Sequence, residues 1–134
     1  MTKNNRRSFI EKASLLALGA TVSSPGVTAP AKPSLIHHVF FWLKNPSSKE
    51  DFEKLIEGIS TLQKIETVQD FRLGKPANTP KRDVIDNSYA VSLFTVFNDI
   101  AGHDVYQEHA IHKKFIESYS HLWTKVQVYD SINI

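Results

Sequence analysis

One stretch constrains the fold more than any other. The run from Ser34 to Leu43 reads SLIHHVFFWL and is apolar on both alternating faces, apart from its two histidines. Successive side chains of a β-strand point to opposite faces, so positions 36, 38, 40 and 42 share one face and positions 35, 37, 39, 41 and 43 share the other. A strand with two apolar faces is covered on both sides. The chain's own helices can supply one cover, and in so short a chain we expect a second subunit to supply the other.

The first 31 residues form a segment of a different kind. Arg6 and Arg7 stand just before a Phe-Ile pair, and an apolar run over 13–22 follows that is too short to span a bilayer comfortably. This pattern resembles a bacterial twin-arginine export signal, and the alternative is a basic tail beside a short amphipathic helix. The small residues Ala29 and Ala31 form a small-x-small pattern, which predicts cleavage after Ala31. We therefore expect a periplasmic protein that meets the membrane only through this segment.

Removal of this segment changes the charge of the chain. The full sequence has 16 Lys and Arg against 14 Asp and Glu, a formal charge of +2. The segment carries four of the basic and one of the acidic residues, which leaves 12 against 13 and a charge of −1. Attraction to nucleic acid or to a membrane surface then loses its main source, so neither is an expected partner. The chain has no cysteine, which excludes disulfides, thiolate nucleophiles and thiolate metal ligands.

Residues 32–134 predict a single domain with one core. Its 103 residues, 134 less 31, bury only a modest fraction of their surface alone, and oligomerisation would increase that fraction. Hydrophobic periodicity and turn residues predict, in order, a strand at 34–43, a helix to about residue 64, a strand at 68–73, a loop at 74–87, a strand at 88–97, a helix after the Asn98-Asp99 cap, a helical piece at 111–120 and a strand at 123–133. This order predicts an α+β, ferredoxin-like plan, in which helices cover one face of a four-stranded antiparallel sheet.

The C-terminal strand carries a carboxylate on its less polar face. A two-residue period places Val126, Val128 and Asp130 together, so we expect Asp130 to point toward the core. A carboxylate there is costly unless something hydrogen-bonds to it, and the upstream histidines are the nearest candidates. The segment from Tyr106 to Asp130 is therefore predicted to line one side of a small pocket.

Three motifs within residues 35–134 resemble the stress-responsive A/B barrel domain family, called Dabb. They are the run Ile36 to Phe41, the pair His109 and His112, and Trp123 followed by a Val-x-Val-x-Asp pattern. The resemblance implies a homodimer in which two ferredoxin-like sheets pack into an α/β barrel. A plant member of this family closes a linear polyketide without a cofactor, so the resemblance implies neither a cofactor nor a metal.

Resemblance to that cyclase also implies catalytic roles. His112 corresponds to its general base, Asp130 would fix the tautomer of that imidazole, and Tyr106 would donate a hydrogen bond to a developing enolate. In an unbroken helix Tyr106 and His112 are six residues, about 600°, apart and do not share a face. The site therefore requires a helix break near Ala110, where the family often has proline.

The same resemblance implies a pocket for a flat or oily ligand. Its expected lining residues are His38, Phe40, Trp42, Leu93 and Trp123, with His38 as the pocket histidine of the first strand. His103 falls where the cyclase has an aliphatic residue, which makes this pocket more polar. We expect His37 and His121 at the surface or at an interface.

Structural roles remain open for several of these residues. His38 can be a core histidine with satisfied hydrogen bonds, Tyr106 and Trp123 can be packing aromatics, and Asp130 can be a cap. Zinc is an alternative for the histidines at 103, 109 and 112, although spacing fixes no third ligand. Three functions follow: a dimer that binds a small apolar or aromatic molecule, a cofactor-independent enzyme resembling a polyketide cyclase or monooxygenase, and a structural dimerisation module.

Overall fold

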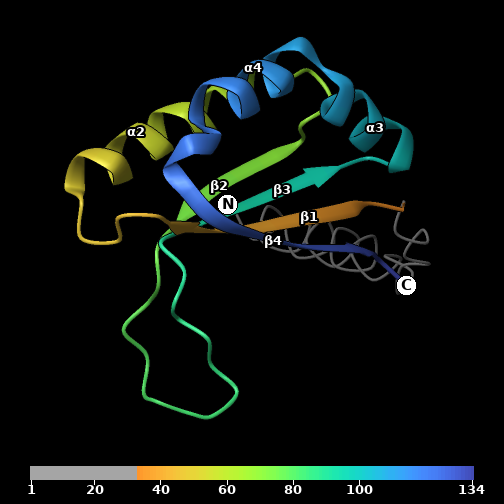
Figure 1. Cartoon of the computed structure of the whole chain (residues 1–134). Helices are drawn as coiled ribbons and strands as arrows, with labels where there is room; N and C mark the ends of the chain where they lie inside the picture. Colours follow the sequence, from red (N-terminus) through yellow and green to blue (C-terminus); the bar gives the residue numbers. More distant parts are fainter. Residues whose placement is uncertain (1–32) are drawn as a thin grey trace, which may run out of the picture. The chain divides into compact units, whose positions relative to one another are not determined.

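The computed structural model describes residues 33–134, so the predicted export signal and its predicted cleavage site lie outside the described residues. Strands and helices form two layers, with the helices together on one face of the sheet (Figure 1). The elements are β1 (Leu35–Leu43), α2 (Lys49–Ser60), β2 (Asp70–Gly74), β3 (Val91–Phe97), α3 (Ile100–Glu108), α4 (Ala110–Tyr119) and β4 (Trp123–Ile132), with 3₁₀ turns at Thr61–Lys64 and Ser120–Leu122. The predicted order of elements is confirmed.

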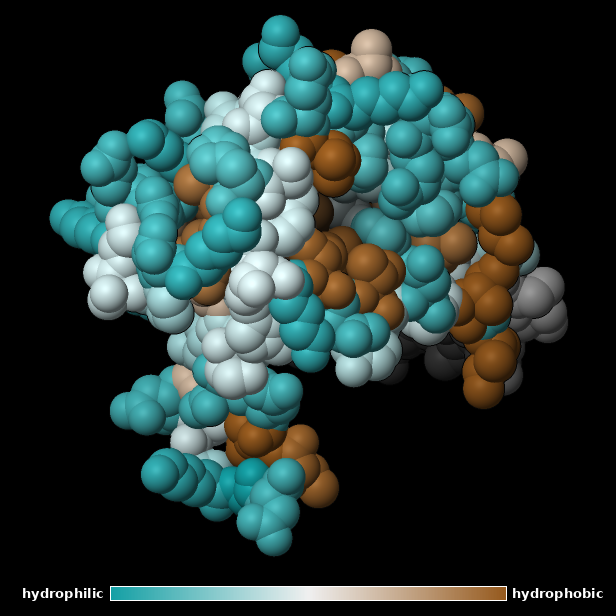
Figure 2. All heavy atoms as spheres, viewed as in Figure 1, coloured by the Kyte–Doolittle hydropathy of each residue, from teal (hydrophilic) through white to brown (hydrophobic). Residues whose placement is uncertain are grey.

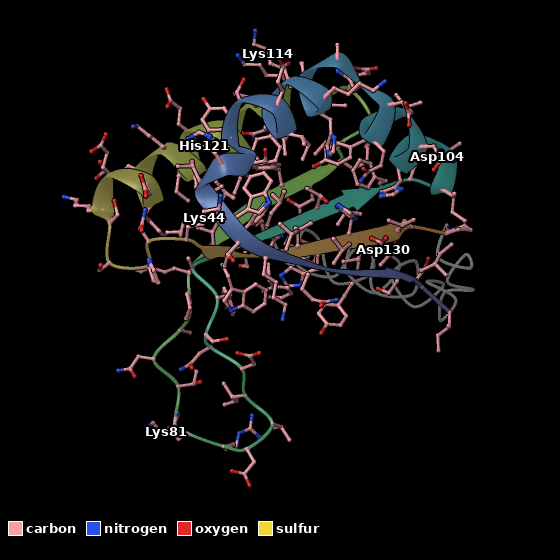
Figure 3. All side chains as sticks on the ribbon, viewed as in Figure 1. Lys44, Lys81, Asp104, Lys114, His121 and Asp130 are labelled. Atoms are coloured by element: carbon pink, nitrogen blue, oxygen red, sulfur yellow. The ribbon has the colours of Figure 1, made fainter. Side chains whose placement is uncertain are left out.

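The four strands form one sheet in the order β2-β3-β1-β4. Each of the three neighbouring pairs is antiparallel, which confirms the ferredoxin-like α+β plan. The third strand begins at Val91 rather than at Ser88, because residues 75–90 form a long connection that leaves the sheet on the side away from the helices (Figure 1). Figure 3 labels Lys81 near the far end of this connection.

Burial alternates along both central strands. In β1 the odd-numbered residues are buried and the even-numbered residues are half-buried, and β3 repeats the pattern. The buried set faces the helices and joins the core with Leu55, Ile59 and Phe115. The two apolar faces of β1 therefore meet different surroundings, as the sequence predicts.

The other side of the sheet is covered by no helix of the described part (Figure 1). We call this surface the free face; its apolar and aromatic residues are Ile36, His38, Phe40, Trp42, Tyr89, Phe94 and Tyr129. The rings are in mutual contact, with centroids 4.4 Å apart for His38 and Phe40 and 6.0 Å apart for Phe40 and Tyr129. A hollow of about 150 Å³ lies between this face and the base of the long connection. So aromatic a surface is typical of one that another molecule covers.

The edge strand β4 is only partly covered by the helices. Val126 and Val128 lie on its helix side, yet 37% and 38% of their surfaces are exposed. Figure 2 shows apolar surface over the middle and the end of this strand.

Within residues 33–134 no helix combines the length and the apolar character that crossing a bilayer requires.

Helix α2 begins and packs as its sequence dictates. The Ser48 Oγ accepts a hydrogen bond from the Asp51 N–H at 3.1 Å, which caps the first turn. On its buried face Gly58 lies directly against the ring of Tyr119 in α4. A Cβ at this position would stand 2.5 Å from Tyr119 Cγ, closer than packed atoms tolerate.

We expect Gly58→Ala to destabilise the protein. In an open helix interior this change stabilises by about 0.5–1 kcal/mol, because Ala restricts the unfolded chain. Here the added methyl group must push the Tyr119 ring away, so we expect the free energy of unfolding to fall by about 1–3 kcal/mol. Urea denaturation measures the change. The matched control is Glu57→Ala on the exposed side of α2, for which we expect a change within about 0.5 kcal/mol.

Candidate functional site

The helix break that the site requires is present, at His109. Helix α3 ends at Glu108 and α4 begins at Ala110, with His109 between them in an extended conformation at φ −65° and ψ 143°. The His109 Nδ1 accepts a hydrogen bond from the Ile111 N–H at 3.1 Å, and its Nε2 lies 3.2 Å from Glu66. A histidine cap thus starts a new helix without proline.

The break brings Tyr106 and His112 together. Tyr106 lies in the last turn of α3 and His112 in the first turn of α4, and their ring centroids are 4.9 Å apart at an interplanar angle of 63°. Tyr106 is 1% exposed and packs against Phe97 of β3. Two of the three expected catalytic residues therefore share one site.

The first strand contributes His37, not His38. His37 lies on the helix side of β1, is 5% exposed, and places its ring 5.8 Å from that of Tyr106. His38 lies on the free face against Phe94. The assignment of His38 to the site and of His37 to the surface is corrected, because both faces of β1 are apolar and alternation could not tell which face meets the helices.

Asp130 lies on the helix side of the sheet, at its exposed edge rather than in the core, and its partner is His37. The two residues lie opposite each other in the pairing of β1 with β4, and His37 Nδ1 is 2.6 Å from Asp130 Oδ1. The Asp130 side chain is 46% exposed because β4 is an edge strand. In this geometry Asp130 is therefore placed to fix the tautomer of His37, and not that of His112 as expected.

His103 completes a group of five polar residues. Its ring lies 4.8 Å from His37 and is stacked 6.4 Å from Tyr106. We call the whole group the histidine cluster; its members are His37, His103, Tyr106, His112 and Asp130. Figure 3 labels Asp130 on β4, at the end of the sheet near α3. Four elements, β1, α3, α4 and β4, thus bring these side chains to one place.

Burial shifts the pKa values of three cluster residues, His37, His112 and Tyr106, toward the neutral side chain. The pKa of His37 is lowered by burial, although the hydrogen bond and the charge of Asp130 oppose the shift. Burial also lowers the pKa of His112, and the neighbouring His37 and His103 add to this effect. Burial raises the pKa of the Tyr106 hydroxyl. Near neutral pH His37 and His112 therefore offer neutral imidazoles beside the protonated phenol of Tyr106, a combination that can accept and donate protons.

The remaining predicted pocket residues do not line this cluster. Leu93 is fully buried in the core, and Trp123 packs against Phe41 and Phe115, with ring centroids 5.3 and 5.5 Å apart. Phe40 and Trp42 lie on the free face with His38. The sheet separates His38, Phe40 and Trp42 from His112. Residues 33–134 of one protomer therefore do not bring the predicted lining residues into a single pocket.

One group of the described residues has the spacing to hold a metal ion. One ligand atom each from His37, His103 and Asp130 lie within 4.8 Å of one another. The zinc alternative from the sequence used a different set, and the structure does not support it. His109 is committed to capping α4 and to Glu66, so it does not join His103 and His112.

We expect His109→Ala to weaken the start of α4 and to loosen the approach of His112 to Tyr106. Loss of the side-chain cap costs about 1 kcal/mol of the free energy of unfolding, with a range of about 0.5–2. His109→Asn is the matched control, because asparagine is a favoured cap and we expect it to retain most of the stability. Chemical denaturation of both variants measures the difference, and an equal loss in both would contradict the capping role.

A family model describes this chain. The stress-responsive A/B barrel domain, Dabb, matches residues 35–133. A comparison with curated proteins finds no match.

Solved structures share the fold at low sequence identity. A Dabb family protein with a ferredoxin-like fold from Mesorhizobium loti is 22% identical with a TM-score of 0.63, over 76% of this chain and 98% of that one. The hydroxynitrile lyase from Passiflora edulis is 16% identical with a TM-score of 0.65, over 78% and 96%. A dimeric ferredoxin-like protein from Bacteroides fragilis is 14% identical with a TM-score of 0.57, over 73% and 94%. Identities this low show the fold alone.

Proposed function

Because the chain belongs to the stress-responsive A/B barrel domain family, we propose that it is a homodimer that binds a small organic molecule at the histidine cluster. The observation that carries this proposal is the approach of Tyr106 to His112, at 4.9 Å between ring centroids, across a break in the helical layer. Small-molecule sites combine apolar walls with a few convergent polar groups. Here the rings of Phe97 and Phe115 supply apolar surface against Tyr106 and His112, and the cluster supplies the polar groups.

The composition of the site suggests the chemical class of the ligand. Tyr106 and the imidazoles offer hydrogen-bond donors and acceptors, while the rings around them favour flat or apolar surfaces. An apolar or aromatic molecule that carries a hydroxyl or carbonyl group satisfies both demands.

The free face is the observation that supports the proposed dimer. An aromatic sheet surface that no element of residues 33–134 covers is favourable to bury against a second copy. Structural relatives from Bacteroides fragilis and Jannaschia are dimeric proteins of ferredoxin-like fold. Packing of two such faces would form the α/β barrel and would leave each histidine cluster on the outer, helical side of the sheet.

Ligand binding is tested on protein purified from its native host and analysed by native mass spectrometry. We expect an adduct of small mass on the wild type and its loss in His112→Phe, which removes the imidazole and keeps a ring. His121→Phe is the control, because His121 is exposed and lies outside the cluster. Equal adducts on all three proteins would contradict binding at the cluster. Spectra in which the wild type carries no adduct would favour a structural dimerisation module.

A second candidate function is cofactor-independent acid–base catalysis on an enolisable compound. The specific observation in its favour is the buried Tyr106 beside His112, since a phenol next to a base can stabilise an enolate as the base removes a proton. Exchange of the methylene protons of acetylacetone in D₂O, followed by NMR, tests the chemistry without knowledge of the substrate. We expect His112→Phe to lower the rate by about 10²–10⁴-fold. A rate equal to that of buffer in the wild type would remove this candidate.

We also propose that the chain is exported through the twin-arginine route. The support is Arg6 and Arg7 ahead of the apolar run at 13–22. Replacement of both arginines by lysine should keep the protein in the cytoplasm, whereas replacement of Lys3 and Lys12 by arginine should not. Cell fractionation measures the outcome, and unchanged export of the Arg6→Lys, Arg7→Lys variant would contradict the proposal.

A further inference from the structure

We propose that His37, His103 and Asp130 form a binding site for a divalent transition-metal ion. Their ligand atoms lie within 4.8 Å of one another, and no other group with this spacing is found among residues 33–134. The inference goes beyond the proposed function, because it concerns the ion alone and needs no organic ligand.

The donor set selects the class of metal. Two imidazoles and one carboxylate suit Zn²⁺, Fe²⁺ and related ions, whereas Mg²⁺ and Ca²⁺ prefer sites made of oxygen atoms. The chain has no cysteine to compete as a ligand. Three protein ligands leave at least one coordination position open, and this is the arrangement of sites that also bind water or a substrate.

Rigid elements hold the three ligands. His37 and Asp130 are directly opposite each other on β1 and β4, and His103 comes from α3 above the sheet. The nitrogens of the His103 ring both have polar neighbours: Nε2 lies 3.3 Å from the Gln107 amide and Nδ1 lies 3.8 Å from Asp104. Only the Gln107 contact is within hydrogen-bond distance, so Gln107 can fix the orientation of the ring when Nδ1 binds the ion.

Metal binding requires two small rearrangements. His37 Nδ1 and Asp130 Oδ1 are 2.6 Å apart, and the three ligand atoms lie within 4.8 Å of one another. Two ligands that each lie about 2.1 Å from a tetrahedral ion are separated by roughly 3.4 Å. The His103 nitrogen must therefore approach the other two ligands by up to about 1.4 Å, and the carboxylate must move away from His37 by less than about 1 Å. Asp130 is free to do so, since its side chain is 46% exposed on an edge strand. The same exposure gives an ion access from solvent.

The test uses the folded full-length protein without an affinity tag, stripped of metal and titrated with Zn²⁺ by calorimetry. We expect one ion per chain, and we expect the affinity to fall by at least about 100-fold in His103→Leu and in Asp130→Asn. His121→Gln, at an exposed position outside the cluster, is the control and should bind as the wild type does. Circular dichroism of each variant establishes that it is folded.

Two results would overturn the site. One is a folded wild type that takes up no Zn²⁺, and the other is uptake that survives both ligand substitutions. Replacement of Zn²⁺ by Co²⁺ provides an independent readout, because coordination by nitrogen and oxygen ligands gives the ion visible absorption bands that the two variants should lack. Since no organic molecule is present, failure of this experiment leaves the proposed ligand-binding function unaffected.

Discussion

Phe97→Ala should lower the free energy of unfolding by about 3–5 kcal/mol. Phe97 is fully buried at the end of β3, and its ring lies 4.9 Å from Tyr106, 5.5 Å from His103 and 6.3 Å from His37. Removal of the ring takes away buried apolar surface and leaves a cavity beneath the histidine cluster. For a domain near this size each kcal/mol shifts the melting temperature by about 4–8 °C, so the fall should exceed about 12 °C.

Phe94→Ala is the matched control for this prediction. Phe94 lies on the same strand but on the free face, where it packs against His38 and not against the cluster. We expect its substitution to cost the isolated protomer less and to weaken dimerisation instead. Thermal melts and urea denaturation of both variants, at one protein concentration, measure the difference. A loss in Phe97→Ala no larger than that in Phe94→Ala would contradict the placement of the core.

Phe40→Glu should convert the proposed dimer into a monomer. Phe40 lies amid the free-face rings, in contact with His38, Tyr89 and Tyr129. An unpaired buried charge costs about 3–5 kcal/mol, and two-fold symmetry introduces two such charges into one interface. We expect the dissociation constant to rise by roughly 1,000-fold or more.

Sedimentation equilibrium at micromolar concentration measures the dissociation constant. Ile116→Glu is the matched control, since it adds the same charge to an apolar residue that is 41% exposed on α4, on the opposite side of the sheet. We expect Ile116→Glu to remain dimeric and Phe40→Glu to retain its fold by circular dichroism. A Phe40→Glu protein that stays dimeric would mean that the two copies do not associate through the free face.

The sequence predicts the fold well because its local signals agree with one another. The Ser48 cap and the order of elements point to a sheet covered by helices on one side, and the second apolar face of β1 is the free face. The start of β3 differs from the prediction. The predicted run begins at Ser88, but pairing with β1 begins only at Val91. Hydrophobic periodicity identifies the run of residues, but it carries no information about where the partner strand pairs.

The site is predicted in part, and its errors have one physical origin. Tyr106 and His112 share a site because His109 starts a new helix, and no proline signals that break. His37 was missed because neighbouring residues of a strand point to opposite faces, and only tertiary packing decides which face meets the helices. The pairing register of β1 with β4, which joins His37 to Asp130, is likewise set by contacts between distant residues.

A crystal structure of the protein purified from its native host tests both the proposed dimer and ligand binding at the histidine cluster. We expect two copies packed through their free faces, and density for a small molecule in contact with Tyr106 and His112 in each copy. Side chains that fill the space beside His112 in both copies, with no room for a ligand, would contradict the proposed binding site.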